Sequence, residues 1–216
     1  MIKALLFDFD GTLVDTNELI IQSFMEVLGE KFPGQFTRND CIQLIGPSLR
    51  QTFEHLTPND VEEMITKYRA HNEAHYDELV KEFEGVVETL HELHAMGIRL
   101  VIVSSKIHDN IVLGLQKLGV AQLFEYVVGA DDVTHVKPHP EPIEKALQYL
   151  QLSKEEVIMV GDNSHDIEGG QNAGVKTAGV SWTIRGEEYL QTFNPDYMLA
   201  KMSDMITIVR EINEEN

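Results

Sequence analysis

The sequence has little cysteine and no long apolar run. Of its 216 residues one is cysteine, Cys41, which excludes an intramolecular disulfide and a zinc cluster built from several cysteines. No stretch reaches the roughly 18 apolar residues that a membrane span requires. The apolar start, residues 1–7, is followed at once by Asp8 and Asp10, too early for a signal peptide. We therefore expect a cytoplasmic protein that folds without disulfides.

Basic residues are also scarce. Lysine and arginine number 17 against 36 acidic residues, which gives a formal net charge of −19 at pH 7 and an isoelectric point near 4.7. Nucleic acids and anionic membrane surfaces carry charge of the same sign and would be repelled over most of the molecule. We expect neither of them as a partner. A small anionic ligand would need local cations or a bound metal.

Short apolar runs alternate with helical patterns along most of the chain. The runs are too short for helices and rich in β-branched residues, so they indicate buried strands at residues 4–9, 99–104, 126–129, 157–161 and 177–181. Between them apolar residues recur at helical spacing, and two of these segments end at Gly97 and Gly119, as helices often do. Such alternation predicts an α/β fold with a doubly wound, Rossmann-like parallel sheet.

The alternation is interrupted once, between residues 15 and 82. This stretch shows no convincing strand, and amphipathic helical spacing dominates it, as at Val61, Met64 and Ile65. We interpret residues 15–82 as an inserted helical domain. Residues 1–14 and 83–216 then form the α/β core.

Chemically active side chains follow the predicted strands. Parallel sheets bind ligands beyond the carboxyl ends of their strands. At these ends the sequence places Asp8, Asp10, Gly11 and Thr12, then Ser104 and Ser105, then Lys137, and finally Asp162 and Asp166. Four carboxylates in one place repel one another unless a cation joins them. Because all-oxygen ligation favours Mg²⁺ over zinc or copper, the sequence predicts a magnesium site at this edge.

These motifs, in this order, resemble those of the haloacid dehalogenase superfamily, and the helical insertion resembles the C1 cap of that superfamily. The resemblance implies that Asp8 is the nucleophile. It implies that Asp10 first protonates the leaving group and then activates water. Ser104 and Lys137 would hold the transferred phosphoryl group. The remaining residues that the resemblance places beside the substrate are Gly11, Thr12 and Ser105.

The resemblance also implies a ligand set for Mg²⁺. Asp8, Asp162 and the backbone carbonyl of Asp10 would bind the ion, and Asp166 would act directly or through water. Asp166 has an alternative role, because its type and position suit a residue that caps the following helix. Catalysis would then depend on positioning and on neutralising charge during phosphoryl transfer.

Segments outside these motifs bear on the substrate. Residues 16–21, 45–49, 131–134, 180–184 and 195–199 resemble bacterial inorganic pyrophosphatases of this superfamily. The resemblance implies magnesium-dependent hydrolysis of pyrophosphate through a phospho-aspartate intermediate, with magnesium pyrophosphate as the favoured substrate. Three alternatives stay open: a phosphatase for phosphoglycolate or another small phosphomonoester, a β-phosphoglucomutase-type isomerase, and a binding protein without catalysis. The sequence does not indicate the oligomeric state.

One hypothesis concerns the second phosphate of such a substrate. Gly46 and Pro47 precede a predicted helix, and the first N–H groups of a helix favour anions. Ser48 and Arg50 could therefore bind the distal phosphate. A helix cap and a surface charge are their alternative roles.

Overall fold

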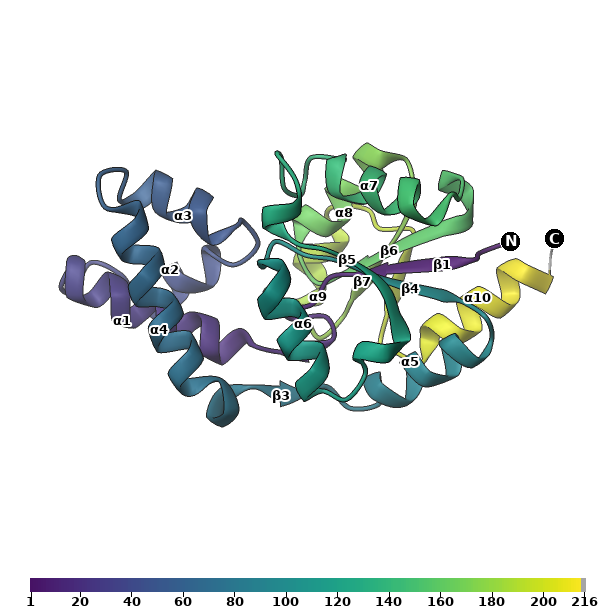
Figure 1. Cartoon of the computed structure of the whole chain (residues 1–216), viewed down its shortest axis with the longest axis horizontal. Coiled ribbons are helices and arrows are strands. Elements are labelled where there is room, and N and C mark those ends of the chain that lie inside the picture. Colours follow the sequence, from purple (N-terminus) through teal and green to yellow (C-terminus); the bar gives the residue numbers. More distant parts are fainter. Residues whose placement is uncertain (215–216) are drawn as a thin grey trace.

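A computed structural model describes residues 1–214 and shows a six-stranded sheet beside a group of helices (Figure 1). The strand order is β5-β4-β1-β6-β7-β8, and every neighbouring pair is parallel. The strands are β1 (Ala4–Phe7), β4 (Arg99–Val103), β5 (Phe124–Val128), β6 (Val157–Gly161), β7 (Lys176–Val180) and β8 (Tyr197–Leu199). The predicted Rossmann-like α/β fold is confirmed.

The apolar pattern predicts five of these strands and misses β8. That strand has three residues, of which two are half-buried. It lies at the edge of the sheet and pairs with β7 alone. A strand so short and so exposed carries too little hydrophobic signal to stand out in a sequence.

Helices cover both faces of the sheet, as the alternation of side chains along β1 requires. Leu5 and Phe7 point into a cluster with α5 (Val86–Ala95), α6 (His108–Lys117) and α10 (Asp204–Glu214). Ala4 and Leu6 point into the opposite cluster, with α7 (Glu141–Leu150) and the end of α8 (Ser164–Ala173). The remaining short helices of the core are η1 (Ala121–Leu123), η2 (Ala130–Asp132), η3 (Lys154–Glu156) and α9 (Glu187–Gln191).

Residues 17–79 form four helices with a hydrophobic core of their own. These helices are α1 (Asn17–Lys31), α2 (Arg38–Gln43), α3 (Leu49–Leu56) and α4 (Val61–Leu79), and they lie to one side of the sheet (Figure 1). Phe24, Phe53 and Tyr68 meet at its centre, with the rings of Phe24 and Tyr68 4.8 Å apart. Burial of such large rings is sufficient to hold short helices together.

The chain enters and leaves this helical group through two short paired strands. β2 (Val14–Asp15) runs antiparallel to β3 (Lys81–Glu82), with Val14 opposite Glu82 and Asp15 opposite Lys81. The helical pattern of residues 15–82 gave no sign of this ribbon. Within residues 1–214 no helix is both long enough and apolar enough to cross a membrane.

Candidate active site at the carboxyl ends of the strands

Four segments bring polar side chains to the carboxyl edge of the sheet. Asp8 follows β1, Ser104 follows β4, and Asp162 follows β6, so these residues leave the three adjacent central strands. Asp166 lies in the first turn of α8. Oxygen atoms of Asp8, Asp162 and Asp166 all lie within 4.8 Å of one another. The sheet therefore gathers three predicted metal ligands in one place.

Lys137 lies between two of these carboxylates. Its ammonium nitrogen is 2.6 Å from Oδ1 of Asp166 and 3.2 Å from Oδ1 of Asp8, and it donates a hydrogen bond of 2.7 Å to the carbonyl of Val103. The side chain is 2% exposed. Burial alone would lower the pKa of Lys137, but the charges of Asp166 and Asp8 outweigh that effect and raise the pKa above its ordinary value. Lys137 therefore remains a cation at neutral pH.

The carboxyl group of Asp8 is short of partners. Burial raises its pKa from 3.8 to about 6, while Lys137 and the Ser104 hydroxyl act in the opposite direction. Its Oδ1 atom is fully buried and accepts no hydrogen bond of normal geometry, although the Lys137 ammonium is near. A buried carboxylate oxygen without a hydrogen bond is costly. It is an open ligand position.

Asp162 is the second acid whose charge lacks compensation. Burial raises the pKa of Asp162 well above its ordinary value, and the charges of Asp166 and Asp8 raise it further. Thr12 donates a hydrogen bond of 3.1 Å to its Oδ1. Gly11, with φ of +77°, passes so close that a Cβ at this position would overlap the Asp162 carboxylate. Gly11 and Thr12 thus shape the acidic cluster.

These residues fit a magnesium ion. Three acids offer oxygen atoms alone, two of them carry raised pKa values, and one buried oxygen is unpaired. Hard oxygen donors of this kind suit Mg²⁺. Asp8 and Asp162, two of the ligands that the sequence suggests, are thus already close together.

Asp166 takes part in two interactions. Its Oδ2 accepts a hydrogen bond of 3.0 Å from the backbone N–H of Asn163, which closes a capping box at the start of α8. Its Oδ1 accepts one from Lys137. The helix-capping alternative thus describes one oxygen atom, whereas the other belongs to the acidic cluster. Each oxygen accepts one hydrogen bond and keeps a second lone pair, so the geometry permits contact with a metal either directly or through water.

Asp10 is paired with a lysine that the sequence motifs do not single out. The ammonium nitrogen of Lys106 lies 2.9 and 3.0 Å from the two carboxylate oxygens of Asp10. Their side chains are 13% and 19% exposed. Lys106 follows Ser104 and Ser105 directly. Its place as a third polar residue after the strand is the feature of the sequence that could have identified it as part of the site.

The two serines after β4 differ in their surroundings. Ser104 is buried, and its hydroxyl accepts a hydrogen bond of 3.3 Å from the backbone N–H of Lys106. Its hydroxyl also helps to lower the pKa of Asp8. Ser105 is half-buried beside it. Ser104 is therefore the serine that directly adjoins the predicted nucleophile.

Ser48 and Arg50 engage other partners in the structure. Ser48 is the N-cap of α3, and its hydroxyl exchanges hydrogen bonds with Gln51 in a capping box. Arg50 is 55% exposed and pairs with Glu62 at 2.7 Å and with Glu54 at 3.8 Å. These are the cap and surface-charge roles that the sequence left open. The geometry gives no support to a phosphate contact at Arg50.

The helical insertion contacts the core beside the acidic cluster. Asn163, which precedes α8, donates a hydrogen bond of 3.1 Å to the carbonyl of Ile45. Gly46 lies against the same residue, since a Cβ at this position would fall 2.7 Å from the Asn163 amide oxygen. Arg185 of the core bonds to Gln43 of α2. Sequence motifs identify none of these contacts, because they join loops far apart in the chain.

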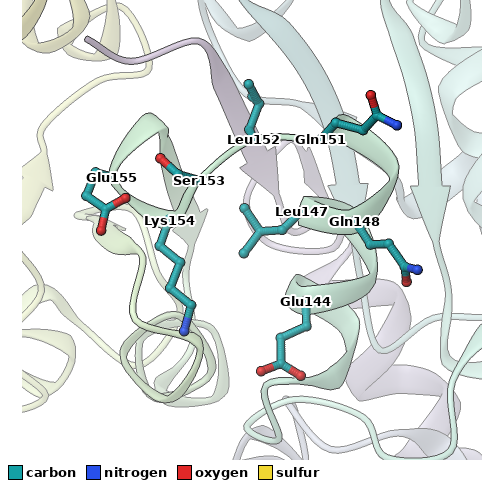
Figure 2. A pocket seen from close by; sticks show the side chains of 8 residues that line it. All are labelled: Glu144, Leu147, Gln148, Gln151, Leu152, Ser153, Lys154 and Glu155. Atoms are coloured by element: carbon teal, nitrogen blue, oxygen red, sulfur yellow. The ribbon is translucent and has the colours of Figure 1, made fainter.

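A shallow groove of about 520 Å³ lies elsewhere, between the end of α7 and η3 (Figure 2). Figure 2 shows Leu147 and Leu152 on one side of it and Lys154 on the other. Because η3 directly precedes β6, this groove is at the amino ends of the strands. It is thus on the opposite edge of the sheet from Asp8.

Comparison with known proteins agrees with the site. A model of the haloacid dehalogenase-like hydrolases matches residues 5–180. This chain belongs to the haloacid dehalogenase-like hydrolase family. Haloacid dehalogenase-like hydrolases generally use Mg²⁺, and the buried acidic cluster could bind such an ion. The resemblance seen in the sequence is confirmed.

Individual members of the family are similar over nearly the whole chain. Pyrophosphatase PpaX of Anoxybacillus flavithermus is 53% identical over 208 residues, which are 96% of this chain and 97% of that protein. Pyrophosphatase PpaX of Bacillus anthracis is 52% identical over 212 residues, 98% of each. A solved haloacid dehalogenase-like hydrolase from Bacteroides fragilis has a TM-score of 0.87 at 28% identity and covers 95% of this chain and 100% of its own.

Proposed function

We propose that this chain hydrolyses inorganic pyrophosphate to two orthophosphate ions. The similarity to PpaX pyrophosphatases carries the proposal, because it extends over at least 96% of both chains at 52–53% identity. The geometry supports the same chemistry, because a buried lysine lies beside Asp8 and the oxygens of Asp8 and Asp162 lie within 4.8 Å of each other.

The first step in this proposal is attack by a carboxylate oxygen of Asp8 on one phosphorus atom. A bond forms between that oxygen and phosphorus, and the bond from phosphorus to the bridging oxygen breaks. The bridging oxygen leaves with the second phosphate and takes a proton from Asp10. Lys137 and Ser104, which adjoin Asp8, would hold the oxygens of the group being transferred. Gly11, Thr12 and Ser105 would surround it.

The second step releases the phosphoryl group from Asp8. Asp10, now ionised, removes a proton from a water molecule whose oxygen attacks phosphorus, and the bond between phosphorus and Asp8 breaks. Both carboxyl groups return to their starting states. Asp10 lies two residues after Asp8, with only Phe9 between them, and the chain turns directly after it at Gly11, so in this proposal both acids reach one phosphoryl group.

Asp8, Asp162 and the backbone carbonyl of Asp10 would hold Mg²⁺, with Asp166 joined directly or through water. The bound ion would supply positive charge beside the phosphoryl oxygens. When Asp10 is protonated, as the first step requires, Asp8, Asp162 and Asp166 leave one negative charge that Lys106 and Lys137 do not compensate, and the loss of the Asp10 proton adds a second. One divalent cation offsets both charges. Pyrophosphate would then arrive as its magnesium complex, which reduces its own charge.

We assign residues 15–82 as a cap and residues 1–14 with 83–216 as the catalytic core. The contacts of Ile45 and Gly46 with Asn163 support this assignment, because they bring the insertion to the edge that carries Asp162 and Asp166. A cytoplasmic location is a further expectation, based on the single, buried Cys41.

A substrate panel tests the function. Purified protein with Mg²⁺ would be assayed on pyrophosphate, phosphoglycolate and glucose phosphates, and kcat/KM compared. We expect the value for pyrophosphate to exceed the others by roughly tenfold or more, a difference of about 1.4 kcal/mol in transition-state binding. The Asp8→Asn variant should lose at least about 10³-fold in kcat. A higher value on phosphoglycolate would contradict the proposal and leave the phosphatase chemistry intact.

A further inference from the structure

Lys106 holds its ammonium group inside the site rather than in solvent. The nitrogen contacts both oxygens of Asp10 at 2.9 and 3.0 Å, and the side chain is 13% exposed. It lies 5.8 Å from the centre of the buried Phe9 ring. The backbone on either side is fixed, since its N–H bonds to Ser104 and its carbonyl accepts from Ala130. This lysine is placed for a task in the site.

Its neighbour Asp10 determines which part of a substrate it faces. In an in-line displacement the nucleophile and the leaving oxygen lie on opposite sides of phosphorus. A proton donor must contact the leaving oxygen. A cation that contacts Asp10 therefore adjoins the leaving group. Lys137 contacts Asp8 and Asp166 instead, on the side of the group being transferred.

We propose that Lys106 binds the leaving phosphate of pyrophosphate, and that its ammonium moves from Asp10 to that phosphate when the substrate arrives. The inference rests on the proposed function. In pyrophosphate the leaving group is itself an anionic phosphate, whereas the leaving alcohol of an alkyl phosphate carries no charge. Lys106 would thus favour a diphosphate over a phosphomonoester whose leaving group is uncharged, such as glycerol phosphate.

Near Asp10 the helical insertion presents two uncharged tyrosine hydroxyl groups. Burial raises the pKa of Tyr68, and burial together with the charge of Asp10 raises the pKa of Tyr76 to about 12. Both hydroxyls on α4 are therefore protonated near Asp10. Four of the six cations of the insertion pair with its own acids: Lys31 with Asp60, Arg38 with Glu18, Arg50 with Glu62, and Lys67 with Glu30. Lys106, from the core, supplies the charge.

Lys106 could instead act only by positioning Asp10, and two substrates separate the roles. Hydrolysis of glycerol phosphate needs the proton of Asp10 but has no second phosphate. Hydrolysis of pyrophosphate needs the same proton and also releases a second phosphate. If Lys106 contacts the leaving phosphate, its loss should harm pyrophosphate hydrolysis selectively. If it only positions Asp10, both reactions should decline together.

The first experiment measures kcat/KM for pyrophosphate and glycerol phosphate with Mg²⁺ in the wild type and in Lys106→Met, which keeps an unbranched chain of four atoms and lacks the ammonium group. We expect the pyrophosphate to glycerol phosphate ratio to fall by roughly 30- to 100-fold, as for loss of one charge-assisted hydrogen bond. Lys106→Arg should recover part of it. Lys3→Met, a matched loss of charge at the start of β1, should leave the ratio unchanged. An unchanged ratio in Lys106→Met overturns the inference.

The second experiment needs no turnover of pyrophosphate. Inhibition constants of imidodiphosphate and orthophosphate would be measured against hydrolysis of p-nitrophenyl phosphate. We expect Lys106→Met to weaken imidodiphosphate by roughly tenfold or more relative to orthophosphate. If both inhibitors weaken equally, Lys106 does not bind a second phosphate. If Lys106→Met selectively weakens imidodiphosphate but the wild type prefers alkyl phosphates as substrates, the Lys106 inference stands and the proposed function is rejected. If the wild type prefers pyrophosphate but Lys106→Met weakens both inhibitors equally, the proposed function stands and the Lys106 inference is rejected.

Discussion

Asp162 is the single residue whose replacement best separates metal binding from folding. It is buried, and burial with two neighbouring acids raises its pKa well above normal. Without a metal its ionised form therefore destabilises the folded protein. We expect Asp162→Asn to raise the Tm of the metal-free protein by a few °C, as about 1 kcal/mol would do in a chain of this length, and to remove most of the stabilisation by Mg²⁺.

Thermal unfolding with EDTA and with magnesium chloride measures both effects. Asp109→Asn is the control, because this substitution removes the same charge from an exposed residue of α6. It should leave the stabilisation by Mg²⁺ unchanged and should lower the Tm of the metal-free protein slightly, because an acid in the first turn of a helix is stabilising. If Asp162→Asn retains the full magnesium-induced increase in Tm, Asp162 is not a ligand.

Asp8 predicts how that stabilisation depends on pH. Its pKa is about 6 in the folded protein, whereas the ordinary value of 3.8 applies to the unfolded chain. Between these two pH values the folded state binds a proton that the unfolded chain has released. This contribution to stability is complete below about pH 4 and is lost as pH rises through about 6. The loss is roughly 3 kcal/mol at most. Mg²⁺ requires the ionised group, so its stabilising effect should increase over the same range.

The measurement is the increase in Tm caused by saturating magnesium chloride at about pH 5 and about pH 7. We expect the larger increase at pH 7, by several °C. Asp8→Asn should flatten this dependence because the titrating group is gone. A larger magnesium effect at pH 5 would refute the assignment.

At the scale of elements, α6 sets the position of the first motif. Its Gly114 packs so tightly that an added Cβ would overlap the Phe9 ring and lie 3.0 Å from the Tyr76 hydroxyl. Phe9 stands between Asp8 and Asp10, so pressure on its ring moves both acids. We expect Gly114→Ala to destabilise the protein by roughly 1–3 kcal/mol and to lower kcat.

A second helical glycine provides the control for this prediction. Gly29 of α1 has no atom within 4 Å of an added Cβ, so Gly29→Ala should stabilise by about 0.5–1 kcal/mol through helix propensity. Denaturant unfolding and pyrophosphate hydrolysis measure both variants. Equal stability of the two would show that α6 can shift without cost.

The same elements show why prediction from sequence succeeded for the centre of the sheet. β1, β4 and β6 are buried on both faces and read as continuous apolar runs. The side chains just after them then follow from strand direction. Lys106 was not predicted as a site residue because a long, flexible side chain can adopt several directions, and the sequence does not determine which one it takes. The hypothesis that Arg50 binds a phosphate was based on its place near the start of a predicted helix, and the sequence did not show that Glu62, on a different helix, lies within reach of it.

At the scale of the whole molecule, the helical insertion is joined to the core through the β2–β3 ribbon. Asp15 lies opposite Lys81, so a short Gly-Gly turn can join them when residues 16–80 are removed. We expect this variant to fold, because the two clusters flanking the sheet draw their buried residues from outside residues 16–80. Without closure it should accept bulky leaving groups, raising the p-nitrophenyl phosphate to pyrophosphate ratio of kcat/KM by roughly tenfold.

Circular dichroism and the two assays test this variant, with the wild type as reference. A folded variant with an unchanged ratio would place discrimination against bulky leaving groups in the core. A decline of both activities by the same factor would mean that the insertion supplies catalysis without selectivity.

The three oxygen atoms around Lys137 bear on how a phosphate enters. An ammonium group has three N–H bonds, and Val103, Asp166 and Asp8 already present one oxygen each within 3.2 Å. Val103 and Asp166 accept hydrogen bonds from this group, whereas Asp8 lies near it without a hydrogen bond of normal geometry, so an incoming phosphate oxygen would compete with Asp8. Asp8, the most distant of the three, is the partner that yields. When orthophosphate departs, the contact between Lys137 and Asp8 re-forms, so Asp8 competes for Lys137 with substrate and product alike.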